Sequence, residues 1–323
     1  MTETALPAPP AAVEGISVTL TRPGSAVLAV LAGSLLAGTA TPAAAAQQIY
    51  AMDWNIAGAT THDGDAGAPN NYGRNAVADR MADLAATWRP VVISVNEACD
   101  SQVSHLRSAL ASRGLPVQAW TFTPTGNPHP ACLLNGGTYA GVAVLSTVAA
   151  DSPASVWFDP TTNQVVGTRT SRGVACLTLH LSRDVRACSM HLAQDQNAAV
   201  AQAQAFATTY GAATRTQPWL VLGDLNATPD RLLPSMYDES AGGAGDFYEA
   251  DMNAPGRGTP TSGSRKIDYV FASSAAFDPG ALGTAVLDPG TCRVNNVIQP
   301  PTWVKYPHPC SDHRPIVGSV TLR

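Results

Sequence analysis

The most constraining feature of this chain is a series of short apolar runs, each bordered by a polar motif. The runs Val91–Val95 and Pro218–Leu222 stop at the motifs NE and GDLN, and the motif SDH comes directly before the run Pro315–Leu322. Runs of this length and composition are typical of buried strands. Loops at strand ends are held by a rigid sheet, so polar groups there can be positioned accurately. The pattern predicts a sheet-based fold with its functional groups at strand ends.

Other segments show helical or strand-like spacing between these runs. No internal repeat and no long linker divides them, so residues 47–323 are expected to form one layered α/β domain. Strands are predicted over residues 48–56, 139–146 and 266–272 and in a hairpin over 172–192, and helices over 74–88, 102–112 and 196–210. The Pro- and Gly-rich segment 278–310 shows little regular pattern.

The N-terminal segment differs from the rest of the chain. A 13-residue apolar run, Ala26–Gly38, follows Arg22 and precedes a small-residue stretch that ends at Ala46. The run is too short for the ~20 residues that cross a bilayer, so a membrane-spanning helix is the weaker alternative. Residues 1–46 are predicted to be a cleaved signal peptide of a secreted, extracellular protein. The stretch before Arg22 is long for such a peptide, which leaves the true start of the chain open.

Composition limits the kinds of partner. Of the 323 residues, 45% are hydrophobic and 13% charged, so a large core is available. The net charge is -5 and no basic cluster stands out, which argues against tight, charge-driven binding of nucleic acid. An enzyme that contacts a few phosphates with the help of a metal ion is still compatible with this balance.

The six cysteines predict disulfides. Their number is even, and export would place them in an oxidising compartment. We expect pairing between nearest neighbours, Cys99–Cys132, Cys176–Cys188 and Cys292–Cys310. The middle pair has the best support, because its segment resembles a hairpin with one cysteine on each strand. A structural metal site is the alternative, but no CxxC spacing occurs.

Several polar residues are candidates for chemistry, although each also has an ordinary structural explanation. A lone carboxylate can be a solvated loop residue, an Asp-Asn turn can be only a turn, and a lone histidine is usually structural. A carboxylate at the end of a buried strand is costly unless it is paired or binds a cation. The candidates are Asn55, Glu97, His191, Asp224, Asn226, Asp268, Asp312 and His313.

The order of the motifs WN, NE, SMH, GDLN, IDYVF and SDH resembles the endonuclease/exonuclease/phosphatase superfamily. Deoxyribonuclease I, the abasic-site endonucleases, neutral sphingomyelinases and inositol-polyphosphate 5-phosphatases belong to it. The resemblance runs from about residue 50 to residue 323. It implies a four-layer sandwich of two mainly antiparallel β-sheets flanked by helices.

The resemblance also implies a role for each candidate residue. Glu97 and Asp312 would bind the metal ion, and Asn55 would contact the metal or its waters. His313 would face the scissile phosphate and Asp268 would orient it. Asp224 and Asn226 would position the attacking water and the phosphate. His191 would be a second phosphate contact, as in the deoxyribonuclease and sphingomyelinase branches. Asn96 departs from the family, which usually has Gln there.

Together these features predict a secreted phosphodiesterase, acting as a monomer without an obligate protein partner. The expected cofactor is Mg²⁺, with Mn²⁺ as the alternative, because the ligands are hard oxygen donors. Either the Asp268–His313 pair or Asp224 would take the proton of the attacking water. Nucleic acid ranks first as substrate. The alternatives are a sphingomyelinase-like phospholipase C, for which the segment 300–310 would touch the membrane, another phosphoesterase such as a phosphomonoesterase, and a binding module that has lost catalysis.

Overall fold

The computed structural model describes residues 46–57, 72–133, 136–251, 258–292 and 308–323. Residues Ala46–Arg323 form one compact unit. Residues 1–45 of the predicted signal peptide lie outside the described residues, as does most of the segment 300–310. In the part of the chain that is described, no helix is both long and apolar enough to cross a membrane.

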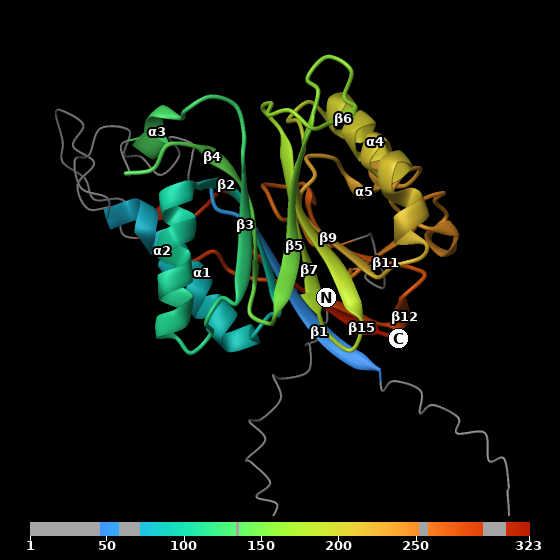
Figure 1. Ribbon diagram of the computed structural model, residues 1–323, viewed down its shortest axis with the longest axis horizontal. Helices are drawn as coiled ribbons and strands as arrows, with labels where there is room; N and C mark the ends of the chain where they lie inside the picture. Colours follow the sequence, from blue (N-terminus) through green and yellow to red (C-terminus); the bar gives the residue numbers. More distant parts are fainter. Residues whose placement is uncertain (1–45, 58–71, 134–135, 252–257, 293–307) are drawn as a thin grey trace, which may run out of the picture. The chain divides into compact units, whose positions relative to one another are not determined.

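Two sheets form the centre of the fold (Figure 1). The first has the strand order β12-β15-β1-β2-β4-β3 and the second the order β10-β11-β9-β8-β7-β5-β6. Only β1–β2 and β8–β9 are parallel pairs among the described strands. The strands of the first sheet are β1 (Gln47–Asn55), β2 (Val92–Cys99), β3 (Ala119–Pro124), β4 (Ala140–Ser146), β12 (Phe277–Val286) and β15 (Ile316–Leu322). Those of the second are β5 (Ala150–Phe158), β6 (Val165–Val166), β7 (Gly173–His180), β8 (Asp184–His191), β9 (Trp219–Asp224), β10 (Phe247–Glu249) and β11 (Asp268–Ser273).

Helices cover the outer face of each sheet, as Figure 1 shows. One apolar core joins the first sheet to α1 and α2, a second fills the space between the sheets, and a third joins the second sheet to α4 and neighbouring segments. The predicted four-layer sandwich of mainly antiparallel sheets is therefore confirmed. The helices are α1 (Tyr72–Trp88), α2 (Asp100–Ser112), α3 (Pro130–Leu133), α4 (Gln196–Thr214) and α5 (Pro229–Leu232), with a 3₁₀ turn η2 (Glu239–Ala241).

The path of the chain between the sheets is simple. The chain completes β1 to β4 in the first sheet and then builds the whole second sheet, β5 to β11, without interruption. It returns to the first sheet only for β12 and β15. Residues 150–273 are thus one continuous segment that docks onto a sheet made from the two ends of the domain.

Local sequence signals explain where the main helices lie. In α1, Val77, Met81 and Ala85 recur at helical spacing and are buried. In α4, the N-cap residue Asp195 accepts a hydrogen bond of 2.9 Å from the backbone N–H of Ala198, which satisfies one free donor of the first turn. Both helices begin within two residues of the predicted position.

All three disulfides connect nearest-neighbour cysteines, as predicted: Cys99–Cys132, Cys176–Cys188 and Cys292–Cys310. The predicted hairpin is the β7–β8 pair, in which Cys176 lies directly opposite Cys188. The last disulfide lies beside a two-stranded ribbon of β13 (Thr291–Cys292) and β14 (His308–Pro309).

The expectation that segment 278–310 lacks regular structure is wrong for its first part, because β12 extends to Val286 and pairs with β15. Pro279 and the glycines in this strand hide its pattern. The strand tolerates them because it is an edge strand whose register shifts between Asp278 and Gly283. The strand β5 was likewise not predicted, and its Pro153 lies at a register shift between Asp151 and Ala154.

Candidate active site

The predicted site residues come together at one edge of the two sheets. The strands β1, β2, β8 and β9 end there, whereas β11 and β15 begin there. In the register of the sheets, Asn55 lies opposite Asn96, and Asp224 lies between His191 on one side and Asp268 on the other. Residues far apart in the sequence therefore meet in one place.

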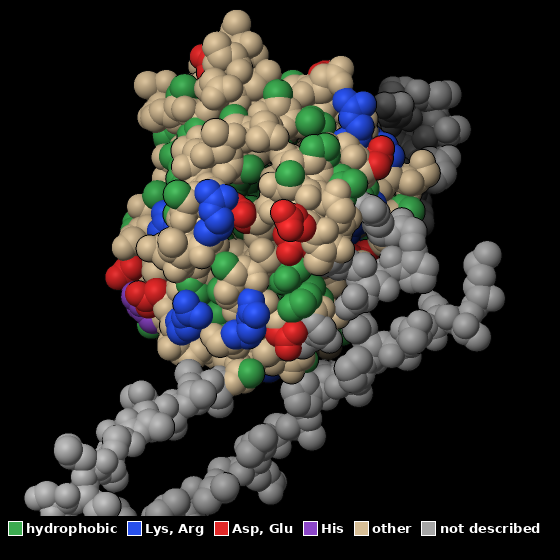
Figure 2. Space-filling model, turned by 90° about the vertical axis from the view of Figure 1, so that its right-hand side faces the viewer, with side chains coloured by type: hydrophobic (Ala, Val, Ile, Leu, Met, Phe, Trp, Pro, Cys, Tyr) green, Lys and Arg blue, Asp and Glu red, His purple; other side chains and the backbone are tan. Residues whose placement is uncertain are grey.

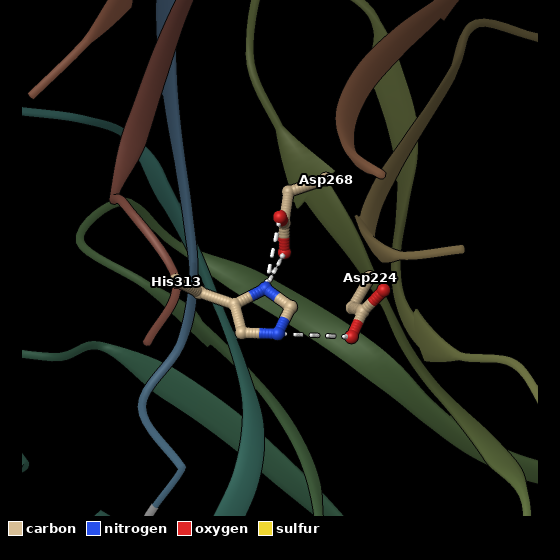
Figure 3. A group of neighbouring side chains, drawn as sticks. All are labelled: Asp224, Asp268 and His313. Carbon is tan, nitrogen blue, oxygen red and sulfur yellow. Dashed lines mark hydrogen bonds and ion pairs between the residues drawn. The ribbon is translucent and has the colours of Figure 1, made fainter. Parts of the chain in front are cut away.

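Asp224, Asp268 and His313 form a buried group that we call the His313 cluster (Figure 3). The Nδ1 atom of His313 lies 3.0 and 2.9 Å from the two carboxylate oxygens of Asp268. Its Nε2 atom lies 3.7 Å from Oδ2 of Asp224, on the other side of the ring. One carboxylate therefore holds the imidazole, and the opposite nitrogen points towards the second carboxylate.

The environment of this cluster shifts the pKa of two of its members. Burial by itself would lower the pKa of His313, but the hydrogen bond with Asp268 and the charges of Asp268 and Asp224 outweigh it and raise the pKa to about 10. Burial, followed by the charge of Asp268, raises the pKa of Asp224 to about 7. At neutral pH the imidazole is thus protonated, and Asp224 lies near its midpoint.

Glu97 and Asn55 lie beside the cluster. The amide nitrogen of Asn55 donates to Oε1 of Glu97 at 3.3 Å and to Oδ2 of Asp224 at 3.0 Å, while its oxygen accepts from the backbone N–H of Ala57 at 3.0 Å. Asn55 therefore links the predicted metal-binding carboxylate to a predicted catalytic one. Glu97 has a φ of 53° and lies where β2 slips in register against β4. Such bulges often redirect a side chain at a functional site.

The donor set of the site fits a divalent cation. Glu97 is 16% exposed, and Asp312 is exposed and accepts no hydrogen bond from the described residues, so its carboxylate is free for a cation. Both line the same pocket. The tightest cluster of possible ligand atoms among the described residues is instead the His313 cluster, whose atoms all lie within 4.8 Å. Both oxygens of Asp268 already contact His313, so they are less available to a cation than the carboxylates of Glu97 and Asp312.

The GDLN motif is a strained turn that connects the end of β9 to the site. Gly223 has a φ of 139°, and a Cβ there would lie 1.9 Å from the carbonyl oxygen of Met190, so only glycine fits. Asn226 has a φ of 51°; its backbone N–H donates to Oδ1 of Asp224 at 2.9 Å and its side chain to the carbonyl of Leu192 at 3.1 Å. These contacts fix the orientation of the Asp224 carboxylate.

His191 contacts an arginine that the sequence reasoning missed. Nη1 of Arg172 lies 3.1 Å from each ring nitrogen of His191, whose Nε2 lies 3.5 Å from Oδ2 of Asp224 and 3.7 Å from Oε1 of Glu97. Burial, followed by the charges of Arg172 and His313, lowers the pKa of His191 well below its usual value, so this histidine is neutral. The sequence offered one signal for this contact. Pairing of Cys176 with Cys188 sets the register of the hairpin, and that register puts the start of β7, next to Arg172, beside the end of β8, where His191 lies.

Asn96 connects the two sheets directly beneath the site. Its amide nitrogen donates to the carbonyl of Met190 at 3.0 Å, and its oxygen accepts from the backbone N–H of Asp224 at 2.9 Å. The neighbouring Ser94 hydroxyl donates to the Ser189 hydroxyl across the same interface at 2.7 Å. Asn96, which stands where the resemblance predicts Gln, therefore makes a contact between the sheets that fixes Asp224.

Two further buried groups support the site and were also missed. Asp53 is fully buried on β1, and burial, followed by the charge of Asp268, raises its pKa well above the usual range. Lys266 is buried two residues before Asp268, with its Nζ 2.8 Å from Oε1 of Glu249 and 3.6 Å from Oδ2 of Asp251. Charged side chains are thus buried close to the His313 cluster.

The site opens into a pocket of about 220 Å³. Most of its wall consists of predicted site residues, but Gln194, Ser262 and Arg265 were not singled out from the sequence. The pocket is lined by Glu97, Gln194, Asp224, Asn226, Ser262, Arg265, Ile267, Asp312 and His313. The arrangement joins a buried group of one imidazole and two carboxylates to an open, oxygen-rich wall, which is compatible with hydrolysis of an anionic ester.

Comparisons with known proteins agree with this geometry. Residues 54–313 match the Endonuclease/Exonuclease/phosphatase family. Truncated TDP2 from Caenorhabditis elegans is 13% identical, with a TM-score of 0.56, and the match covers 84% of this chain and 97% of that one. The human Nocturnin catalytic domain is 16% identical (TM-score 0.58; 85% and 94% covered). An endonuclease/exonuclease/phosphatase family protein from Bacteroides thetaiotaomicron is 13% identical (TM-score 0.59; 86% and 99% covered). No curated protein matches the chain.

Proposed function

Because the chain belongs to the endonuclease/exonuclease/phosphatase family, we propose that it is a secreted, Mg²⁺-dependent phosphodiesterase whose substrate is nucleic acid. The observation that carries this proposal is the His313 cluster, with Nδ1 of His313 held 2.9 Å from Asp268 and the free side of the ring directed into a pocket that Glu97 and Asp312 also line. Family members are metal-dependent phosphoesterases or nucleases.

The pKa values support a division of labour between the two sides of the cluster. A histidine with a pKa of about 10 keeps its proton at neutral pH, so His313 is suited to donate a hydrogen bond to a phosphoryl oxygen. Asp224, with a pKa of about 7, is suited to accept a proton from the attacking water. We therefore assign the base to Asp224 rather than to the Asp268–His313 pair. A divalent cation held by Glu97 and Asp312 would supply charge neutralisation at the phosphate and the leaving oxygen.

Neutral His191 and Asn226 complete the proposed assignment. His191 lies between Arg172 and the two carboxylates Glu97 and Asp224, so its ring would approach a phosphoryl oxygen together with the guanidinium of Arg172. Asn226 would hold the Asp224 carboxylate in place through its backbone N–H. Preorganised donors of this kind typically contribute ~10²–10³ in rate.

The three disulfides favour an oxidising compartment and hence secretion. The surface gives no sign of a strongly basic binding face on the side shown in Figure 2, where Lys and Arg side chains are scattered among Asp and Glu. With a net charge of -5 and no basic cluster in the sequence, such a phosphodiesterase would depend on contacts close to the scissile phosphate. The sphingomyelinase-like alternative rests on segment 300–310, of which only residues 308–310 are described.

The proposal is tested with purified mature protein incubated with plasmid DNA, RNA or sphingomyelin liposomes, each with Mg²⁺ and with EDTA. We expect cleavage of nucleic acid that EDTA abolishes. Cleavage of sphingomyelin alone would favour the phospholipase, and bound metal without cleavage of any substrate would favour a phosphomonoesterase or a binding module; either result refutes the nuclease.

The assignment of the site is tested with Asp224→Ala and His313→Ala. Each should lower activity at least ~10²-fold because it removes a proton acceptor or a phosphate donor. Circular dichroism checks that the fold is intact. His180→Ala is the matched control. This exposed histidine lies at the opposite end of the β7–β8 hairpin from His191, so its replacement should leave activity unchanged. Wild-type turnover in either site variant would overturn the assignment.

A further inference from the structure

Arg265 is the one pocket-lining cation that the proposed chemistry does not use. It lines the pocket together with Ser262 and the catalytic residues, yet its side chain is exposed. It forms no ion pair with any carboxylate in the described part of the chain. Two other arginines near the surface do pair with carboxylates: Arg113 with Asp83 at 2.6 Å and Arg215 with Asp246 at 3.2 Å. An unpaired guanidinium at the mouth of an anion site is available for a ligand.

The backbone that carries Arg265 is fixed relative to the His313 cluster. Ser262 and Arg265 close a tight turn through two backbone hydrogen bonds of 3.0 and 2.9 Å, and Ser262 also pairs with His313 as an isolated β-bridge. The hydroxyl of Thr261 accepts from the backbone N–H groups of Ile267 and Asp268, each at 3.1 Å. The Cα of Arg265 is therefore held at a set position beside the catalytic histidine, although its side chain reaches into solvent.

The size of the pocket sets what Arg265 can contact. Pockets that enclose a whole drug-sized ligand have volumes of about 300–1,000 Å³. This pocket, at about 220 Å³, has room for the scissile phosphate and its immediate substituents but not for neighbouring units of a chain. The groups next to the scissile phosphate must then lie at the mouth, where Arg265 is exposed.

We propose that Arg265 determines substrate class by binding a second phosphate, adjacent to the scissile one, in a nucleic-acid strand. The proposal rests on the proposed phosphodiesterase function and narrows it. A guanidinium matches a phosphate in charge and in its paired donor geometry. The same guanidinium would repel the quaternary ammonium in the phosphocholine head group of sphingomyelin. A single-phosphate ester without neighbouring phosphates would gain nothing from Arg265.

The test compares wild type, Arg265→Ala and Arg265→Lys on a short labelled DNA, an RNA of the same sequence and bis(p-nitrophenyl) phosphate, all with Mg²⁺. For Arg265→Ala we expect KM on the nucleic acid to rise roughly tenfold, with kcat and the hydrolysis of the single-phosphate ester within about twofold of wild type. The slope of log KM against log salt concentration should decrease by roughly 0.7–0.9, which is the change expected when one phosphate contact is lost. Arg265→Lys should restore much of KM because it keeps the charge.

The control is Arg183→Ala, which removes an exposed arginine from the β7–β8 turn, at the opposite end of that hairpin from His191. It should change neither KM nor the salt slope. An unchanged KM in Arg265→Ala, or an equal loss on both kinds of substrate, would overturn the role of Arg265. If wild type hydrolyses none of these substrates, the proposed function fails instead, and the two failures are thus distinguishable.

Discussion

Asp268→Asn removes one charge from the His313 cluster and should alter both the pKa of His313 and the pH dependence of stability. The substitution keeps the size of the side chain but replaces one of the two oxygens within 3.0 Å of Nδ1 and removes the negative charge. Burial of the ring, which lowers its pKa, is unchanged. The pKa of His313 should therefore fall from about 10 to well below that value.

The magnitude follows from linkage between protonation and folding. A folded-state pKa raised from 6.5 to about 10 stabilises the protein fully below about pH 6.5, and this stabilisation is lost as the pH rises through about 10. Between about pH 8 and about pH 10, the wild-type protein should lose about 2 kcal/mol of unfolding free energy from this group alone. In Asp268→Asn this loss should be nearly absent. Asp224, with a pKa of about 7, is ionised at both pH values and does not contribute to the difference.

The assay is urea unfolding of EDTA-treated protein at these two pH values, combined with an NMR titration of the His313 imidazole. Asp184→Asn is the control, because Asp184 hydrogen-bonds the exposed His180 and its removal should leave the wild-type loss between pH 8 and 10 unchanged. A His313 pKa near 10 in the Asp268→Asn variant would refute the reasoning, as would an equal pH dependence in wild type and Asp268→Asn. Activity should fall at least ~10²-fold in the variant, because the imidazole loses its orientation and its proton.

Other perturbations test the metal position, the inter-sheet contact and the hairpin disulfide. Glu97→Gln should weaken Mg²⁺ binding at least roughly tenfold, because a charged oxygen ligand is lost, and calorimetric titration that finds unchanged affinity would contradict the metal position. Asn96→Ala removes two buried side-chain hydrogen bonds to the backbone and should lower the unfolding free energy by about 2–4 kcal/mol; a loss under ~1 kcal/mol in urea would argue against the contact. Replacing Cys176 and Cys188 by Ser opens a short loop and should cost about 3 kcal/mol in thermal unfolding, and an unchanged melting temperature would exclude a stabilising role.

Much of the fold was predictable because its central strands carry a local signal. β2 and β9 contain short apolar runs that stop at polar motifs, and burial on both faces requires apolar residues there. The strands β5 and β12 were missed because their prolines and glycines oppose strand propensity locally. Their register shifts, which depend on neighbouring strands, accommodate those residues.

The site divides in a similar way. Residues such as Asp224 and His313 stand in short motifs at strand boundaries, so the sequence alone could single them out. The contacts of Arg172 and Asn96 could not be found from local patterns, because each arises from pairing or docking of distant segments. Asn96, for example, bonds to Met190 on the opposite sheet, 94 residues away. The position of Arg265 at the pocket, without an ion-pair partner among the described residues, likewise depends on how the fold places its turn.

Because residues 150–273 run through the second sheet without interruption, the candidate site is assembled from two distinct halves of the domain. The first sheet and the segments leading into its strands carry Asn55, Glu97 and His313, while the second carries Asp224 and Asp268. Neither half holds a complete set of reactive groups, even with every strand correctly formed. A molecule with intact sheets that have slipped apart would keep its circular dichroism spectrum and be inert. Under the proposed function, hydrolytic activity would therefore measure the docking of the two halves, which spectroscopic probes of secondary structure do not detect.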